Sequence, residues 1–216
     1  MLSSNDPADP LDVLPEPLRR LARRGELKRF RKGHRLIQEG DQGDTLFIIL
    51  SGRVRVFGSG DRDREITYGT YGAGEYLGEI SLDGGPRSAS VVTLEACECA
   101  VVTRATLQQH IAEHPEFAFD LLAKVIRRAR AATLSTKQLA LNDVYGRLVL
   151  LLNDLALALP DGTRRVAERL THREIANRLG CSREMVSRLV KDLEAGGYLG
   201  ASLGHYTLLR VLPARW

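Results

Sequence analysis

Three side chains in the last quarter of the chain have the chemistry that reads base pairs: Arg183, Glu184 and Arg188. Arginine can donate two hydrogen bonds to O6 and N7 of guanine, and glutamate can accept one from N4 of cytosine. All three fall on one face of an expected helix over residues 182–193. Contacts to phosphates fix the register of a DNA reader without specifying sequence. The residues expected to make them are Ser182, Arg173 and Lys191.

The elements that would hold this face form a helix-turn-helix. Thr171 and Glu174 have the spacing of a capping box, which predicts the start of a first helix. Gly180 can take the left-handed conformation that ends this helix. Ser182 is a natural N-cap for the second helix, and two short strands flanking Gly204 would add a wing. The apolar stripe of the second helix, opposite its polar face, consists of Val186, Leu189, Val190 and Leu193.

The charges on the second helix also have a plainer interpretation. They would then form a solvated helix face, on which Glu184 and Arg188 pair at i,i+4 spacing. A short helix, a glycine turn and a second helix with a polar face together favour recognition of DNA over this alternative.

A second group of residues, earlier in the chain, has chemistry suited to a sugar phosphate. Gly78 would let the backbone approach a ligand, and the carboxylate of Glu79 could accept a hydrogen bond from a ribose 2′-hydroxyl. Arg87 offers a charged fork for a phosphate, and Ser88 offers a hydroxyl beside it. Glu79 and Arg87 could instead form an ion pair that braces a loop. Their combination within a glycine-rich region favours a cyclic nucleotide.

The elements around this second group change character along the chain. Glycine recurs every few residues from Gly25 to Gly85, which indicates short strands and tight turns, as in a sandwich or barrel. After Pro86 no glycine occurs until Gly146, and the composition favours helix. One long helix would carry a heptad seam, which could pair two copies of the chain or lie on its own domain. The seam consists of Leu122, Ile126, Ala129, Thr133, Thr136 and Ala140.

Bulk composition limits the classes of protein. The 216 residues are 44% hydrophobic, as is typical of a globular protein, and their formal net charge of +4 is compatible with an anionic partner without establishing one. Because no apolar run approaches a bilayer span and the N-terminus lacks an apolar signal region, we expect a cytoplasmic protein with no membrane partner. A helix over 144–159 and a strand over 164–166 are also expected.

Metal sites and catalytic motifs are not evident in the sequence. Cys97 and Cys99 are interpreted as core residues, and His110 and His114 as a surface pair, because no further ligands accompany them. The chain has no P-loop, no G-x-S-x-G elbow and no zinc-protease motif. We therefore predict no metal and no enzyme, with hydrolysis of a cyclic nucleotide as the alternative to exclude.

The two motifs together resemble those of one family. The stretch LTHREIANRLGCSREMVSRLVKDLE is similar to the winged helix-turn-helix of the cyclic AMP receptor (catabolite activator) family, and GEYLGEISLDGGPRSASV is similar to its phosphate-binding cassette. The resemblance implies an α+β fold: a cyclic-nucleotide-binding β-barrel (jelly roll), a long dimerisation helix and a winged helix-turn-helix. The expected divisions are a flexible tail over 1–18, then 19–114, 115–142 and 143–216.

The same resemblance implies a homodimeric regulator of transcription. Arg183, Glu184 and Arg188 match the base-reading positions for a TGTGA-like half-site in double-stranded DNA, repeated as a palindrome with centres about 34 Å apart. Met185 replaces a threonine that contacts phosphate in the family. RNA polymerase is a further expected partner.

The resemblance leaves the effector open, because the long helix departs from the family pattern. Ala132 and Thr133 stand where the family uses a threonine and a serine to contact adenine, so only Thr133 keeps a hydroxyl. Cyclic AMP is the first expectation. Cyclic di-GMP is the alternative, since Arg127, Arg128 and Arg130 supply extra positive charge, unless these arginines only form a solvated face. Ligand-independent DNA binding, or a cyclic-nucleotide-binding regulatory subunit without DNA binding, are further alternatives.

Overall fold

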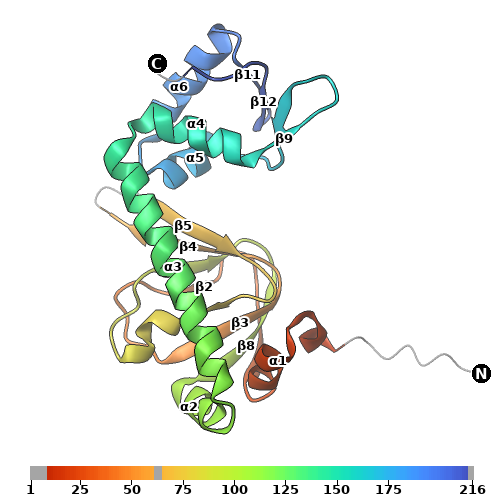
Figure 1. The fold of residues 1–216 in the computed structure, drawn as a ribbon, viewed down its shortest axis with the longest axis vertical. Coiled ribbons are helices and arrows are strands. Elements are labelled where there is room, and N and C mark those ends of the chain that lie inside the picture. The colour runs from red at the N-terminus through yellow and green to blue at the C-terminus, as the bar shows by residue number, and fades with distance from the viewer. Residues whose placement is uncertain (1–8, 61–64, 214–216) are drawn as a thin grey trace, which may run out of the picture. The chain divides into compact units, whose positions relative to one another are not determined.

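The computed structural model describes residues 9–60 and 65–213. Contacts divide these residues into two compact units. One unit holds the described residues up to Ser59 together with Thr67–Ala129, and the other holds those from Arg130 onward with the short segment before Thr67. Figure 1 shows the elements in chain order. The helix α3 (Glu116–Leu141) contains the boundary between the two units.

The first unit is built on two antiparallel four-stranded sheets, with strand orders β1-β8-β3-β6 and β2-β7-β4-β5. The glycine-punctuated region therefore forms the expected jelly-roll arrangement, as two sheets rather than a closed barrel. Its strands are β1 (Glu26–Phe30), β2 (Arg35–Ile37), β3 (Thr45–Ser51), β4 (Val54–Ser59), β5 (Glu65–Tyr71), β6 (Tyr76–Leu77), β7 (Ser90–Thr93) and β8 (Cys97–Thr103). Its helices before α3 are η1 (Pro10–Val13), α1 (Glu16–Ala22), η3 (Glu79–Asp83) and α2 (Arg104–Glu113).

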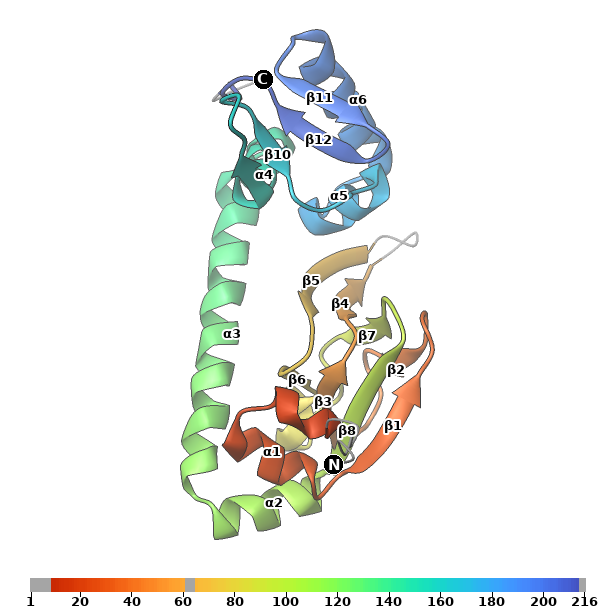
Figure 2. The same ribbon diagram turned by 90° about the vertical axis from the view of Figure 1, so that its right-hand side faces the viewer.

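The segment over residues 9–18 is not a flexible tail. Leu11, Leu14 and Leu18 are buried in one core cluster with Leu46 and Val102 of the sheets. The helices α1 and α2 both contact β8 (Figure 2). The tail was expected because the segment is acidic and rich in proline, but its leucines bury enough apolar surface to order it. Residues 1–8 lie outside the described residues.

The long helix α3 exposes most of its apolar side chains. Within the described chain, Phe117 is its buried residue. All six residues of the predicted heptad seam are exposed. A helix that packs its apolar stripe on its own domain would bury that stripe. The exposure favours the alternative in which the seam meets a second copy of the chain.

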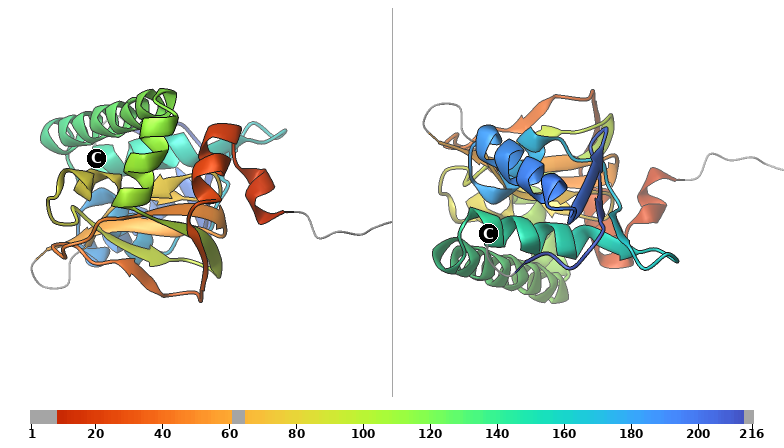
Figure 3. Two further views of the ribbon diagram at one scale, coloured as in Figure 1. Left: turned by 90° about the horizontal axis from the view of Figure 1, so that it is seen from below. Right: turned by 90° about the horizontal axis from the view of Figure 1, so that it is seen from above.

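The second unit combines three helices with one antiparallel sheet of order β11-β12-β10-β9, seen from above in the right-hand view of Figure 3. Its core is one cluster that includes Leu148, Ile175, Val186 and Tyr206. The helix expected over 144–159 ends earlier, because residues 156–158 pair with a strand instead. The elements are α4 (Val144–Leu155), β9 (Ala156–Ala158), β10 (Arg164–Val166), α5 (His172–Leu179), α6 (Arg183–Ala195), β11 (Leu199–Ser202) and β12 (His205–Leu208).

The expected surface pair of histidines is wrong for His110, which is 1% exposed on α2. Its ring lies 5.1 Å from that of Phe117 and 4.9 Å from that of His114. Neither ring nitrogen has a hydrogen-bond partner in the described structure. Burial, with added repulsion from His114 and Arg24 that Glu113 and Glu116 oppose, lowers the pKa of His110.

We predict that His110 makes stability fall in acid. The folded state favours the neutral ring, so its contribution is fully present above the unfolded pKa of about 6.5 and is lost as the pH falls through the lower folded pKa. Denaturant unfolding of the wild type and His110→Leu at about pH 8 and pH 5 should show a smaller loss of free energy of unfolding in the variant. An equal loss in both proteins would contradict this prediction.

Candidate nucleotide and DNA sites

The turn after β6 is built around Gly78. This residue has φ 98°, in the left-handed region, and it is the N-cap of η3. A Cβ at this position would lie 2.5 Å from the carbonyl oxygen of Thr45 and 2.7 Å from Nη1 of Arg87. Both the backbone conformation and the close approach therefore require glycine here. The turn brings Glu79 and Arg87, predicted from the sequence, to the same hollow.

Arg87 is buried, with 7% of its surface exposed. Its Nη1 donates hydrogen bonds to Oγ of Ser81 at 2.8 Å and to the carbonyl oxygen of Gly78 at 3.1 Å. Its Nη2 donates to Oγ1 of Thr45 at 2.9 Å. Its backbone is also fixed, since its N–H donates to the carbonyl oxygen of Asp41 at 2.8 Å. The sequence did not indicate the roles of Thr45 and Ser81, because short hydroxyl side chains carry no spacing signal.

The charge of Arg87 has no direct counterion in the described part of the chain. Among the described residues it makes hydrogen bonds to neutral oxygens and no ion pair. Burial lowers the pKa of the Arg87 guanidinium, and the negative charges of Asp44 and Glu79 oppose this effect. A buried cation with neutral partners is stabilised by an anion that arrives beside it. The arrangement is therefore suited to a phosphate.

Glu79 pairs with Arg128 of α3 rather than with Arg87. Its Oε1 accepts a hydrogen bond from Nη1 of Arg128, whose Nη2 also donates to the carbonyl oxygen of Tyr76 at 2.8 Å. The alternative of a Glu79–Arg87 ion pair is thus not what the structure contains. Glu79 is 5% exposed, and its Oε2 is buried without a hydrogen-bond partner among the residues that the structure describes. This oxygen is free to accept a hydrogen bond from a ligand hydroxyl.

Arg128 was missed as a site residue, although a signal exists. Glu75 and Glu79 are four residues apart, and so are Lys124 and Arg128. Lys124 pairs with Glu75 and lies 3.9 Å from the centroid of the Tyr76 ring. Two cations on one turn of a helix and two carboxylates at matching spacing can form two ion pairs. Arg128 is therefore not part of a solvated face.

The hollow between these groups is small. Its volume is about 50 Å³, whereas sites for small ligands usually enclose roughly 300–1,000 Å³. Ser88 is exposed at this hollow. The side chains that line it include Leu77, Glu79, Arg87, Ser88 and Arg128.

The helix-turn-helix forms as the sequence predicted. Oγ1 of Thr171 accepts a hydrogen bond from the N–H of Glu174 at 3.2 Å, and Oε2 of Glu174 accepts one from the N–H of Thr171 at 2.7 Å. Gly180 ends α5 with φ 66° and ψ 38°. Ser182 caps α6, since its Oγ accepts from the N–H of Met185 at 3.2 Å. These local interactions fix the start of both helices.

The predicted contact residues lie on the solvent side of this unit, while the apolar stripe of α6 is buried. Glu184 and Arg188 form no ion pair within the described residues. The alternative of a solvated helix face with a Glu184–Arg188 ion pair is therefore not supported. The exposed members of the predicted set are Ser182, Arg183, Glu184, Arg188 and Lys191. Arg173, on α5, is also exposed.

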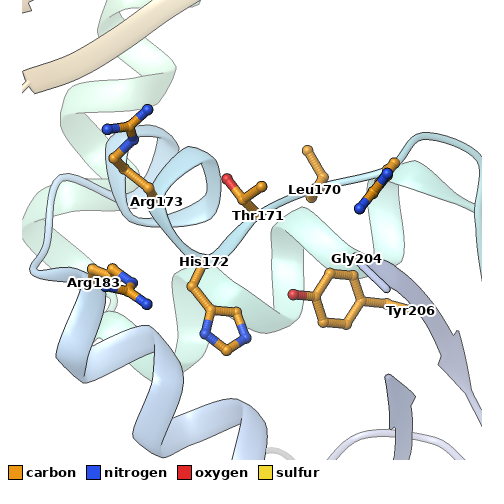
Figure 4. Close-up of a pocket in the computed structure, with 8 residues that line it drawn as sticks. Leu170, Thr171, His172, Arg173, Arg183, Gly204 and Tyr206 are labelled. Atoms are coloured by element: carbon orange, nitrogen blue, oxygen red, sulfur yellow. The ribbon is translucent and has the colours of Figure 1, made fainter. Parts of the chain in front are cut away.

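A basic hollow of about 490 Å³ lies at the start of α5 and α6. Arg169, Arg173 and Arg183 line it, together with His172 and with Gly204 from the wing turn. Figure 4 shows His172 between Arg183 and Tyr206 in this view. The sequence reasoning missed Arg169 and His172. A signal for both was their place within two residues of the Thr171 cap.

His172 also connects the two helices. Its Nδ1 lies 2.7 Å from Oγ of Ser187 on α6. A hydrogen bond to one ring nitrogen fixes how the ring is oriented. This contact holds the recognition helix to the first turn of α5.

Other chemistry is not evident in the described residues. Histidine, cysteine and carboxylate side chains there form no group of three that could bind a metal. Burial raises the pKa of Cys99 to about 12, with smaller contributions from Cys97 and Glu98, as expected for an unreactive core thiol. Among the described helices, none has both the length and the apolar character needed to cross a bilayer.

A jelly-roll unit with a buried arginine cassette, followed by a winged helix-turn-helix, defines the class of ligand-regulated DNA-binding proteins. Residues 27–114 match the family model described as "Cyclic nucleotide-binding domain". Residues 169–201 match the one described as "Bacterial regulatory proteins, crp family". The chain is 32% identical to the CRP-like cAMP-activated global transcriptional regulator of Mycobacterium tuberculosis over 191 residues, which covers 87% of this chain and 85% of the relative. The chain belongs to the CRP family of transcription regulators and is not an enzyme.

Two further relatives differ in what their names state. The CRP-like protein Clp of Xanthomonas oryzae is 33% identical over 178 residues, covering 77% of this chain and 76% of the relative. The solved structure of the c-di-GMP responsive global regulator CLP of Xanthomonas campestris aligns with a TM-score of 0.79 and 28% identity, covering 90% of this chain and 98% of that one. The family thus includes relatives with two different cyclic nucleotides in their names.

We predict that Gly78→Ala destabilises the protein more than Gly74→Ala does. Both glycines have positive φ, but an added Cβ at Gly74 meets nothing within 4 Å, whereas at Gly78 it meets backbone. The positive φ alone costs about 1–2 kcal/mol, and the contact with backbone should add about 1–3 kcal/mol at Gly78. Denaturant unfolding of both variants measures the difference, and equal losses would contradict the predicted crowding.

Proposed function

We propose that the chain is a transcription regulator whose DNA binding is gated by a cyclic nucleotide in the Gly78–Ser88 cassette. The observation that carries this proposal is the buried guanidinium of Arg87, which has neutral hydrogen-bond partners and no ion pair among the described residues. A cyclic phosphate would lie against Arg87, with Ser88 as a second donor. The unpaired Oε2 of Glu79 would accept a hydrogen bond from the ribose 2′-hydroxyl.

Binding would require side chains to move. A hollow of about 50 Å³ is too small for a nucleotide. Arg128 lines the hollow and pairs with the carboxylate that the ribose would use. A ligand would therefore compete with Arg128 for Glu79. The position of the Arg128 side chain on α3 would then differ between the free and the ligand-bound protein.

Cyclic AMP is the proposed effector, in line with the name of the Mycobacterium tuberculosis relative. Cyclic di-GMP, to which the Xanthomonas campestris regulator responds, is the second candidate. Thr133 is the proposed adenine contact, and Ala132 offers no side-chain hydrogen bond.

The proposed assembly is a homodimer through the seam of α3. A long helix with exposed Leu122 and Ile126 on this seam would bury these side chains against the same helix of a second copy. Two copies would then present two recognition helices to a TGTGA-like palindrome. Arg183, Glu184 and Arg188 would read bases. The residues proposed for phosphates are Ser182, Arg173 and Lys191.

A DNA-binding regulator of this kind would act in the cytoplasm with RNA polymerase as its further partner. The family and the proposed DNA contacts support both this location and this partner. The chemistry of the site needs no metal, because arginine and hydroxyl donors suffice for a phosphate.

We predict that Arg87→Ala abolishes the nucleotide response of DNA binding. Loss of a buried charge-assisted contact should weaken nucleotide binding by roughly 10- to 100-fold. Calorimetric titration of the full chain with cyclic AMP, cyclic GMP and cyclic di-GMP measures this loss and ranks the effectors. Arg87→Lys keeps the charge without the fork, and Arg29→Ala removes an exposed arginine of the same unit as a control. An unchanged response in Arg87→Ala would refute the proposed site.

We predict that Arg183→Ala costs about 1–3 kcal/mol on a TGTGA-like palindrome and relaxes selectivity at one base position. Lys191→Ala, a matched change on the same helix, should weaken binding about equally on all sequences and lower the salt dependence by about one charge. Fluorescence anisotropy at several salt concentrations separates the two effects. If Arg183→Ala weakened specific and random DNA equally, Arg183 would be a phosphate contact.

A further inference from the structure

The wing turn contains a leucine in an unfavourable backbone conformation. The strands β11 and β12 pair up to Ser202 and His205, so Leu203 and Gly204 form a two-residue loop. Leu203 has φ 50° and Gly204 has φ 81°. Such a loop favours Asn-Gly, because both central residues need positive φ. Leu203 is the one non-glycine residue with positive φ in the described part of the chain.

Packing does not compensate for this strain. The side chain of Leu203 is 81% exposed, so it contributes little to the core of its unit. An exposed leucine in the left-handed region lowers stability in two ways, through its backbone and through its contact with water. Strained residues of this kind tend to persist where they serve function.

The turn that carries Leu203 is held firmly. The N–H of Leu170 donates to the carbonyl oxygen of Gly204 at 2.8 Å. A Cβ on Gly204 would lie 2.9 Å from Cγ of Arg169 and 3.1 Å from the carbonyl oxygen of Leu170. The loop is thus packed against the chain that leads into α5. Leu203 therefore projects from a turn with a defined position.

The turn borders the basic hollow at the start of α5 and α6. Gly204 lines the hollow together with Arg169, Arg173 and Arg183, and Figure 4 shows Gly204 on the opposite side from Arg183. If Arg183 stands in a major groove and the arginines contact the adjacent phosphates, the wing turn lies across that row of phosphates. In B-DNA each row of phosphates separates a major groove from a minor groove, so a group that crosses this row from the major groove reaches a minor groove.

We propose that Leu203 makes an apolar contact with deoxyribose at the edge of the minor groove that flanks each half-site. Proteins that bind the minor groove frequently place apolar side chains there, in addition to arginine and lysine. The proposal rests on the proposed function, since it requires the basic face to bind DNA. It adds a contact with no charge and no hydrogen bond to the arginine contacts already assigned.

The decisive variant is Leu203→Asn, which has opposite effects on stability and on binding. Asparagine suits the turn, so thermal unfolding should shift to higher temperature. Affinity for a duplex with a TGTGA-like palindrome and several flanking base pairs should fall about three- to tenfold, as expected for a lost apolar contact. The slope of affinity against salt should stay the same, because no phosphate contact is lost.

Two further variants sharpen the test. Leu203→Met keeps an apolar side chain on the same backbone and should keep the affinity of the wild type. Leu157→Asn removes an exposed leucine from β9 of the same unit and should leave affinity unchanged. Both are measured by anisotropy on the same duplex as Leu203→Asn.

The outcomes separate this inference from the function on which it rests. If Arg183→Ala weakens binding but Leu203→Asn does not, the leucine contact is wrong and the DNA face stands; the leucine would then be free for a protein partner. A change of about one charge in the salt slope of Leu203→Asn would also overturn the inference, because it would indicate a backbone phosphate contact. If Arg183→Ala itself has no effect on binding, the proposed function fails first.

Discussion

The guanidinium of Arg87 is held away from water by hydrogen bonds to Ser81, Thr45 and the carbonyl oxygen of Gly78. Burying such an ion costs several kcal/mol, which neutral acceptors offset in part. Its neighbours are arranged around it. A Cβ at Gly78 would meet Nη1 of Arg87, so this position requires glycine. The carbonyl oxygen of Asp41 accepts a hydrogen bond from the N–H of Arg87 and so fixes the backbone of Arg87. On the proposed function, Arg87 would therefore be held in place before an anion binds, which would reduce the cost of ordering it on binding.

Glu79 connects this cassette to the long helix. Its carboxylate accepts a hydrogen bond from Arg128 on α3 and keeps Oε2 unpaired. A ligand that hydrogen-bonds to Glu79 would have different affinities for two states of the protein: one in which Arg128 is paired with Glu79, and one in which Arg128 has left it. Such a difference is what a population shift requires. On the proposed function, α3 would carry this change along its own length toward Thr133 and the exposed seam.

The elements set by local chemistry could be predicted from the sequence, and those set by distant contacts could not. Thr171, Gly180 and Ser182 define the helix-turn-helix through hydrogen bonds within a few residues, so their positions were correct. The helix after residue 144 ends at Leu155 because the next residues pair with a distant strand. The ion pair of Arg128 joins residues 49 positions apart. Composition could not reveal either contact, although the matching four-residue spacing of the charges was available.

The residues that contradict local rules fall mostly at the two proposed sites. Arg87 is a buried cation without an ion pair in the described structure, Glu79 has an unpaired buried oxygen, and Leu203 is an exposed residue with strained φ. Each lowers the stability of the free protein. On the proposed function, a bound nucleotide would supply partners for Arg87 and Glu79, and bound DNA would cover the exposed side chain of Leu203. His110 is the exception: its ring nitrogens have no partner among the described residues, and its ring packs beside those of Phe117 and His114 rather than at either site. Local rules therefore fail for two reasons here: preparation for a ligand, and the packing of α2 against the start of α3.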